Sequence, residues 1–201
     1  ADDPGDERRR QRRKLHQDEG GGDGLLSRAR NAIAAVLKLP QVSEPEHPAL
    51  WEPGATFVTL RHDGRLRGCI GRLHAERALH EDVRRNAQSA AFEDPRFGPL
   101  RAAEWVGLEV EVSLLGAAQP LPAGDEDEAL RALRPGEDGV ILDWRGRRAT
   151  FLPQVWEQLP EPAEFLGELK RKAGLSADFW HAEVRLSRYR VRKFAELGAG
   201  R

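Results

Sequence analysis

Residues 108–114 alternate between apolar and polar side chains, which is the pattern of a strand with one buried face. Such a strand requires a sheet that packs one face on a core, and antiparallel sheets commonly have this form. Glu109 and Glu111 share the polar face, about 7 Å apart at the rise of a strand. The two carboxylates could serve as acid and base or hold a cation, or they could form a solvated face paired with arginines.

The remaining elements lack the regular strand–helix–strand order of a doubly wound sheet. Apolar spacing predicts helices over 25–37, 76–91, 125–134 and 165–173. Strands are expected as hairpins over 56–71 and 140–152, and as a long final strand over 180–191 with a bulge near Ser187-Arg188. This order favours an α+β fold with a mainly antiparallel sheet and flanking helices.

The hexapeptide 66–71, LRGCIG, contains the only cysteine of the chain. It follows a β-prone run and the turn dipeptide Asp63-Gly64, so the two runs are expected to form a hairpin. Alternation along the second strand places Cys69 and Arg67 on one face, away from the aliphatic side chains. A neighbouring guanidinium lowers the pKa of a thiol, as a reactive cysteine requires.

Gly68 and Gly71 flank the cysteine and leave room for a ligand or another backbone to approach. A structural interpretation is also open. In it, Cys69 is a small buried apolar side chain and the glycines mark a bulge.

Composition separates the first 24 residues from the rest. They hold six basic and seven acidic residues, and Leu15 is their only sizeable aliphatic side chain. Too little apolar surface is available there to offset the entropy of ordering. We therefore expect a disordered charged tail over 1–24, one folded domain over 25–196, and a flexible C-terminus over 197–201.

Charge and cysteine content restrict the function classes. A formal net charge of −1 provides no overall field for nucleic acid or anionic lipid, so neither partner is expected. No apolar run approaches the ~18 residues of a membrane span, and one cysteine forms no internal disulfide, which fits a cytoplasmic location. His74 and His80 are about 240° apart on a helix, at ~100° per residue, so no metal site is expected. No motif identifies a cofactor.

Seven motifs follow one another in order along residues 25–196. They are GATFVTL (54–60), LRGCIG (66–71), DPRF (94–97), LEVEVSLL (108–115), DGV (138–140), FLPQV (151–155) and KAGL (172–175). Together they resemble the AMMECR1 domain family. The resemblance implies a two-lobed α+β domain with the hexapeptide beside a cleft, and it suggests Memo-like and radical-SAM proteins as partners. It brings no settled activity with it.

The DPRF motif adds two candidates to the site. In isolation, the segment is a turn held by an Asp–Arg pair, because Pro95 forces Asp94 out of the helical region. Since the segment matches the family motif, the resemblance makes Asp94 and Arg96 candidate site residues, with Phe97 as the anchor.

We carry three hypotheses about function, and whether the protein is an enzyme stays open. In the first, the cleft binds or transforms a small anionic metabolite. Arg67 and Arg96 hold the anion, the amides of Gly68 and Gly71 approach it, and Cys69 is the nucleophile or an acid–base group. The nearest candidates for a general base are His62, His74 and Glu109.

The other two hypotheses involve no chemistry. The cleft could bind a nucleotide-like ligand or a peptide, in which case Cys69→Ser would leave binding nearly intact. Alternatively, the domain could be a partner-binding scaffold with Trp51, Trp105 or Trp144 as anchors.

Overall fold

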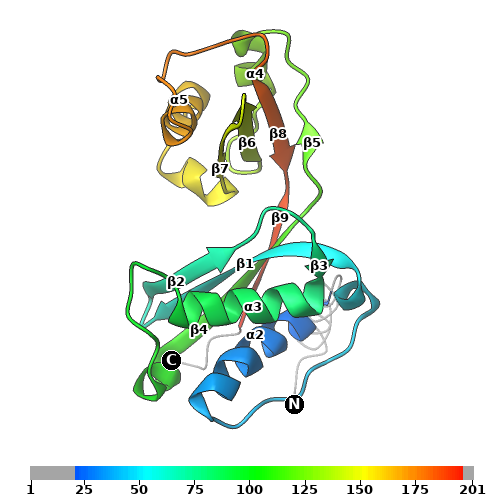
Figure 1. The fold of residues 1–201 in the computed structure, drawn as a ribbon, viewed down its shortest axis with the longest axis vertical. Coiled ribbons are helices and arrows are strands. Elements are labelled where there is room, and N and C mark those ends of the chain that lie inside the picture. Colours follow the sequence, from blue (N-terminus) through cyan, green and yellow to red (C-terminus); the bar gives the residue numbers. More distant parts are fainter. Residues whose placement is uncertain (1–20, 197–201) are drawn as a thin grey trace, which may run out of the picture. The chain divides into compact units, whose positions relative to one another are not determined.

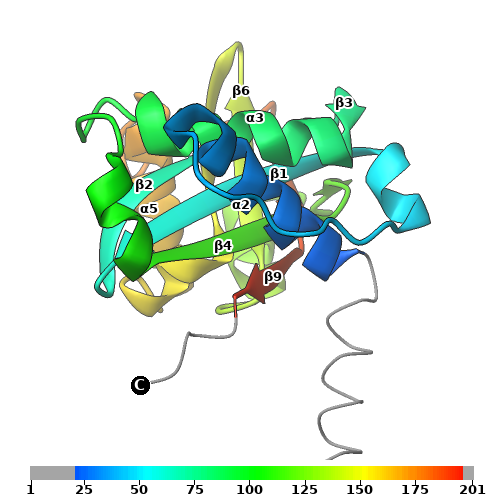
Figure 2. The same cartoon turned by 90° about the horizontal axis from the view of Figure 1, so that it is seen from below.

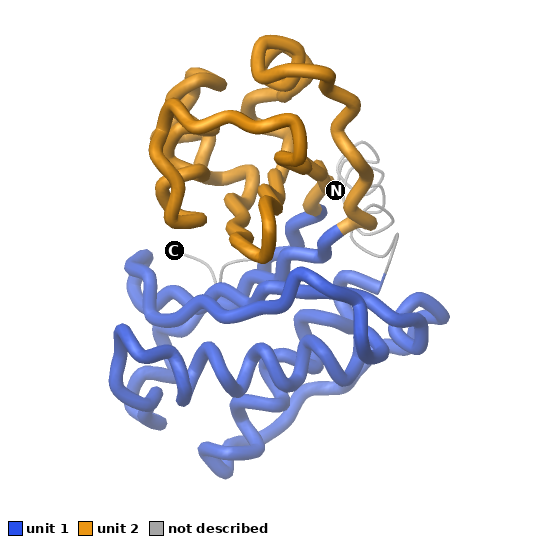
Figure 3. Tube along the Cα trace, turned by 45° about the horizontal axis from the view of Figure 1, so that its top comes forward, with its two compact units in different colours: residues 1–115, 192–201 blue, residues 116–191 orange. Residues whose placement is uncertain are grey.

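A computed structural model describes residues 21–196, and the chain divides into two compact units (Figure 3). Unit 1 consists of residues 1–115 and 192–201, and unit 2 of residues 116–191. The predicted flexible C-terminus and residues 1–20 of the predicted tail lie outside the described residues. The last residues assigned to the tail already belong to a helix, which begins at Gly22.

Unit 1 packs two helices on one face of a five-stranded sheet (Figures 1 and 2). The helices are α2 (Gly22–Leu37) and α3 (Leu79–Phe92), with 3-10 helices at Pro48–Trp51 and Ala102–Gly107. The strands are β1 (Pro53–His62), β2 (Arg65–Gly71), β3 (Arg77–Ala78), β4 (Leu108–Leu115) and β9 (Val191–Ala195). The sheet order is β2-β1-β4-β9, with β3 paired to β1, so β2 is an edge strand.

The core of unit 1 lies between the helices and one face of the sheet. Val58 and Leu60 of β1, with Val110 and Val112 of β4, are buried there against α2 and α3. Because side chains alternate along a strand, the residues between them point to the opposite face. The predicted alternation of 108–114 is therefore confirmed.

Helix α3 begins three residues later than predicted. Arg77 and Ala78 pair with Gly54 and Pro53 as the short strand β3, and the helix can begin only after them. The apolar positions that predicted the helix, including Val83 and Ala87, are fully buried. Periodicity thus located the helix correctly but not its first turn.

Unit 2 has a four-stranded sheet and two helices (Figure 1). Its strands are β5 (Gln119–Pro120), β6 (Gly139–Trp144), β7 (Arg147–Phe151) and β8 (Arg185–Tyr189), in the order β5-β8-β6-β7. Its helices are α4 (Glu126–Ala132), α5 (Pro162–Lys172) and a 3-10 helix at Pro153–Glu157. Phe165 and Trp156 stack at the centre of its core, with ring centroids 3.7 Å apart.

Two local signals in unit 2 are confirmed. The β6–β7 hairpin turns at Arg145 and Gly146, which both have positive φ angles, as a two-residue turn requires. Helix α5 is followed by Gly174 in the left-handed region, and the Leu175 N–H donates to the Lys170 carbonyl. With antiparallel pairing of β1 to β2, β3 and β4, and of β6 to β7 and β8, the predicted α+β class is confirmed.

The expectation of one long bulged strand at the end of the chain is wrong. The segment forms two strands in different sheets, β8 beside β6 and β9 beside β4, with Arg190 between them. The parity change in the apolar pattern lies inside β8, whose register with β6 is continuous, because Leu186 and Tyr189 are both buried although they point to opposite faces of the strand.

Candidate functional site

The β1–β2 hairpin that carries Cys69 turns at Asp63 and Gly64. Both have positive φ angles, 50° and 79°, and such a turn matches the twist of the strands it joins. Glycine takes this conformation without strain, and aspartate tolerates it. The predicted hairpin is confirmed.

A β-bulge at Arg67 changes which side chains share a face of β2. The partners of two consecutive β1 residues are not consecutive: Gly68 lies opposite Leu60, and Leu66 lies opposite Arg61. Arg67 is the extra residue and has no partner on β1. The strict alternation expected here is wrong, because the bulge moves Leu66 to the face of Cys69.

Cys69 belongs to a row of side chains that crosses three strands. It lies opposite Thr59, which in turn lies opposite Glu111, on the face away from the core. The Thr59 hydroxyl is 3.3 Å from Cys69 Sγ, within hydrogen-bonding distance of a sulfur atom. The next row on this face places Arg61 opposite Glu109. The polar face thus combines a half-buried thiol, a hydroxyl, a cation and two carboxylates.

Asp94 and Arg96 cap the outer edge of β2 at Cys69. Asp94 Oδ2 accepts the Cys69 N–H at 3.0 Å, and Arg96 Nη2 lies 3.5 Å from the Cys69 carbonyl oxygen. The two side chains also bind each other, through Arg96 Nε at 3.1 Å and Nη2 at 2.8 Å. Because an edge strand has unpaired main-chain groups, this cap takes the place of a neighbouring strand.

The cap also determines the charge of Asp94. The Arg96 guanidinium holds the pKa of Asp94 far below its ordinary value, and the N–H groups of Cys69 and Arg96 add to the effect against the opposing influence of burial. The same contact raises the pKa of Arg96. Asp94 is therefore ionised at neutral pH despite its burial. The segment forms the Asp–Arg turn that its sequence predicts.

Arg67 is committed to other groups of the chain. Its Nε and Nη2 donate to the Glu104 carboxylate at 2.7 and 3.2 Å, and Nη2 also donates to the Gly98 carbonyl at 2.9 Å. This contact lowers the pKa of Glu104. The guanidinium groups of Arg67 and Arg96 lie 5.7 and 5.5 Å from the centroid of the Phe97 ring, within the range of a cation–π interaction. A role of Phe97 as the anchor of the site stays a prediction.

The space beside both glycines is occupied by the chain itself. A Cβ atom on Gly68 would lie 2.0 Å from the carbonyl oxygen of Ala90 in α3. A Cβ atom on Gly71 would lie 2.3 Å from Phe57 Cγ. The glycines allow a helix and a side chain to approach β2, so packing accounts for their position. A role in binding a ligand stays a prediction.

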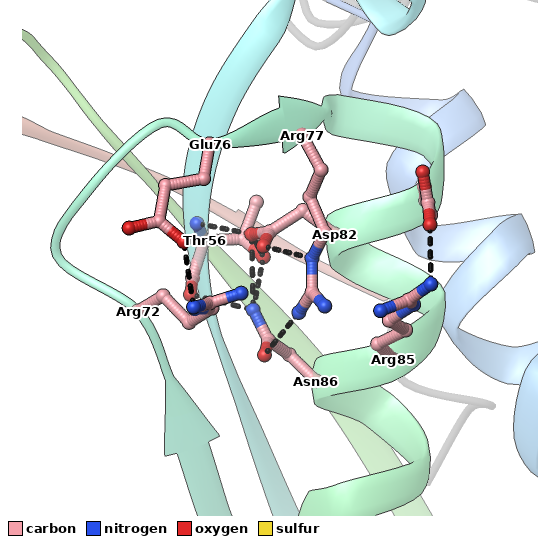
Figure 4. A network of polar contacts seen from close by, with 8 residues as sticks. Thr56, Arg72, Glu76, Arg77, Asp82, Arg85 and Asn86 are labelled. Atoms are coloured by element: carbon pink, nitrogen blue, oxygen red, sulfur yellow. Dashed lines mark hydrogen bonds and ion pairs between the residues drawn. The ribbon is translucent and has the colours of Figure 1, made fainter.

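A second polar network lies in the same unit, where α3 meets β1 (Figure 4). Asp82 Oδ2 accepts from the N–H and hydroxyl of Thr56 and from Asn86 Nδ2, at 2.7–3.0 Å. Asp82 Oδ1 accepts from Arg77 Nε at 2.8 Å. No motif in the sequence predicted this network, since its members are scattered and each is an ordinary surface residue by type.

All six predicted site residues lie in unit 1, and the structure divides the four that have functional side chains into two groups. Cys69, Asp94 and Arg96 contact one another, whereas Arg67 binds the segment that follows Phe97. Sequence reasoning missed Thr59, because a two-residue turn without a bulge pairs Thr59 with Gly68. It recognised Glu111 only as a possible acid, base or surface group. No pattern in the sequence indicated that Glu104 is the partner of Arg67.

The two buried charged residues of unit 2, Lys170 and Asp138, have structural partners. Lys170 is buried, pairs with Glu126, and donates to the Ala177 carbonyl at 3.1 Å. Asp138 accepts the Arg134 N–H at 2.8 Å. Across residues 21–196, no group of three His, Cys, Asp or Glu side chains is placed to hold a metal ion. Over the same range, none of the helices combines the length and apolarity needed to cross a membrane.

Comparison with known proteins shows the family. The AMMECR1 family model matches residues 26–194. A protein of Thermococcus gammatolerans is 35% identical over 189 residues, covering 87% of this chain and 90% of the relative. Protein TV1384 of Thermoplasma volcanium is 35% identical over 176 residues, 84% and 86% of the two chains. The crystal structure of PH0010 from Pyrococcus horikoshii, 33% identical, covers 90% of this chain and 93% of its own with a TM-score of 0.78. The chain therefore belongs to the AMMECR1 family.

Proposed function

We propose that the protein binds a small anionic metabolite beside Cys69, and that the Cys69 thiol is the group available for chemistry on it. One observation carries the proposal. The Arg96 guanidinium reaches the main chain of Cys69 and binds Asp94, yet 54% of the Arg96 side chain is exposed. A cation that is fixed in place and open to solvent attracts an anion to the neighbouring thiol.

Arg67 has a supporting part in this proposal. Glu104 and Gly98 occupy two of its nitrogens, so it holds the segment after Phe97 against the bulge of β2. Its Nη1 is buried and has no partner among residues 21–196. We therefore assign the anion to Arg96 rather than to the pair of arginines.

Alkylation of Cys69 tests the proposal. Iodoacetate carries a negative charge and iodoacetamide is neutral, so the ratio of their rates measures the attraction of an anion to the thiol. We expect Arg96→Gln to lower this ratio about threefold, which matches the 0.2–1 kcal/mol of an exposed ion pair. The matched control is Arg72→Gln, because Arg72 is an exposed arginine just beyond β2 that pairs with Glu76. The control should leave the ratio unchanged.

Two results would overturn the proposal. A thiol that reacts with neither reagent until the protein unfolds would leave Cys69 a packing residue. If the ratio of the iodoacetate rate to the iodoacetamide rate is the same in the wild type and in Arg96→Gln, Arg96 does not attract an anion to the thiol. Retained binding of a ligand by Cys69→Ser would instead support binding without chemistry, the second hypothesis.

The partner-binding hypothesis has one observation in its favour. Trp51 is 63% exposed, whereas Trp105 packs against the core of unit 1 and Trp144 packs edge-on to Phe179. Of the three predicted anchors, Trp51 is thus available to a partner. Memo-like and radical-SAM proteins remain our proposed partners, and a cytoplasmic location our proposed setting. Partner binding would be supported if Trp51→Ala loses binding to either purified partner while Cys69→Ser retains it.

A further inference from the structure

The polar face of the sheet indicates how Cys69 could lose its proton. We propose that Glu111 is the proton acceptor for Cys69 and that it acts through the hydroxyl of Thr59. This inference rests on the proposed function, because it assumes that the thiol reacts. The inference adds Glu111 to the site, a residue that lies outside both the LRGCIG and the DPRF motifs.

Strand spacing makes Thr59 the necessary intermediate. Neighbouring strands lie about 4.8 Å apart, so the main chains of Cys69 and Glu111 are roughly 10 Å apart across β1. Thr59 stands between them, with its hydroxyl 3.3 Å from Cys69 Sγ. The Cβ atoms of directly opposed residues lie about 5 Å apart, so the longer Glu111 side chain can reach the same hydroxyl. A threonine hydroxyl accepts one hydrogen bond while it donates another.

Glu111 is free to complete this row. It is half-buried, and within the part of the chain that the structure describes its carboxylate makes no ion pair and no hydrogen bond. The carboxylate is not bonded to Thr59 in the resting structure, so the relay closes by rotation of the Glu111 side chain. That rotation breaks no hydrogen bond or ion pair of the carboxylate with a described residue.

The three bases suggested by the sequence are placed less well. Glu109 lies one row further along, opposite Arg61. His62 lies opposite Arg65 on the other face of β1, with its Nδ1 3.5 Å from Asp63. His74 is exposed in the segment that follows β2. Only Glu111 shares a row with Cys69.

The charged groups around this row come from four elements. Arg61 belongs to β1 and Glu109 to β4, and Asp94 and Arg96 follow α3. On β9, Phe194 is in the core, so alternation places Lys193 on the polar face. Glu109 and Glu111 lie on the same face of β4, but in different rows. Glu109 is therefore a matched control for Glu111.

The proposed step is proton transfer alone. The Sγ–H bond of Cys69 breaks and its proton passes to Thr59 Oγ1. The original hydroxyl proton of Thr59 passes to a carboxylate oxygen of Glu111. Thr59 ends unchanged, Glu111 becomes neutral, and the electron pair remains on sulfur.

The test is the pH profile of Cys69 alkylation by iodoacetamide. Removing the proton acceptor with Glu111→Gln should move the profile to higher pH and lower the rate at pH 7 about threefold. Thr59→Val, which keeps the shape but removes the hydroxyl, should act in the same direction. The double variant should add nothing to either change, because both break one relay. Thr59→Ser and Glu109→Gln should keep the wild-type profile.

The outcomes separate the two proposals. If Glu111→Gln and Glu109→Gln move the profile equally, or if the effects of Thr59→Val and Glu111→Gln add, the carboxylates act through a general field and the relay is wrong. The thiol site of the proposed function would still stand. If Cys69 reacts in none of the folded proteins, the proposed function fails first, and the relay has no role to fill.

Discussion

Asp82 and Asp94 are two buried carboxylates of unit 1, and each is paired with an arginine. The side chain of Asp82 is 1% exposed and its partner Arg77 is 14% exposed. The side chain of Asp94 is 2% exposed, but its partner Arg96 is 54% exposed. The first pair is closed off from solvent on both sides, and the second presents its cation to water.

The difference shows that burial of a carboxylate does not by itself indicate a functional site. Asp82 Oδ2 joins α3 to β1 through Thr56, and Asp82 Oδ1 binds Arg77 of β3 (Figure 4). Thr56 and Asn86 are buried, and Arg77 is mostly buried. Asp94 accepts the N–H groups of Cys69 and Arg96, and it fixes the exposed guanidinium of Arg96 beside Cys69. A network that ends in an exposed charge can meet a ligand, whereas a closed one can only stabilise the fold.

The largest effect should come from removing Asp82. Asp82→Ala removes the carboxylate partner of Arg77 Nε and the acceptor of the buried donors of Thr56, so we expect a loss of about 3–5 kcal/mol in the free energy of unfolding. Asp94→Ala should cost less, about 1–3 kcal/mol, because Arg96 can return to water. Urea unfolding of both variants measures the difference. Equal losses would mean that the exposure of the arginine does not distinguish the two networks.

The next effect concerns the packing of β2 beneath the exposed network. Gly68→Ala places a methyl group 2.0 Å from the Ala90 carbonyl oxygen, so α3 must shift. We expect a loss of about 1–3 kcal/mol in urea unfolding, the typical cost of overpacking. Gly98→Ala is the control, because a Cβ atom there has no neighbour within 4 Å. If Gly68→Ala is as stable as the wild type, packing against α3 does not explain the glycine, and a role in binding a ligand would be considered again.

The smallest effect should be a dependence on pH. Since the pKa of Asp94 is lowered on folding, its ionised form stabilises the protein above the unfolded pKa of about 4 and loses this contribution as pH falls. The stability difference between the wild type and Asp94→Asn should therefore be constant near pH 6. It should shrink by about 1 kcal/mol between pH 4 and pH 3. Urea unfolding at several pH values checks this, and a difference that does not change with pH would show that Asp94 is not held ionised by Arg96.

Short-range features of the fold were predictable because short-range physics produces them. Asp63-Gly64 predicted a two-residue turn, alternation over 108–114 predicted the buried face of β4, and Gly174 predicted the end of α5. Each depends on the backbone preferences or side-chain direction of a few consecutive residues. The helix periods were correct for the same reason.

The errors occurred where pairing between distant segments decides. The bulge at Arg67 depends on how β2 fits against both β1 and α3, and alternation within β2 cannot reveal it. The late start of α3 depends on β3 pairing with β1. The division of the last strand at Arg190 depends on the pairing of β8 with β5 and β6 in one sheet and of β9 with β4 in the other. Each is a choice between local conformations of similar energy that distant contacts resolve.

For the site, sequence alone was enough to single out Cys69, Asp94 and Arg96 as candidates, because their motifs are short and contiguous. It could not show that Asp94 binds the Cys69 N–H, that Arg67 is held by Glu104, or that Thr59 lies beside the thiol. These contacts join residues 10 to 37 positions apart. A bulge of one residue determines the contact between Thr59 and the thiol, since it changes the partner of Thr59 from Gly68 to Cys69. A hydrogen bond depends on distances of a few tenths of an ångström, and only the folded packing of β2 sets those distances.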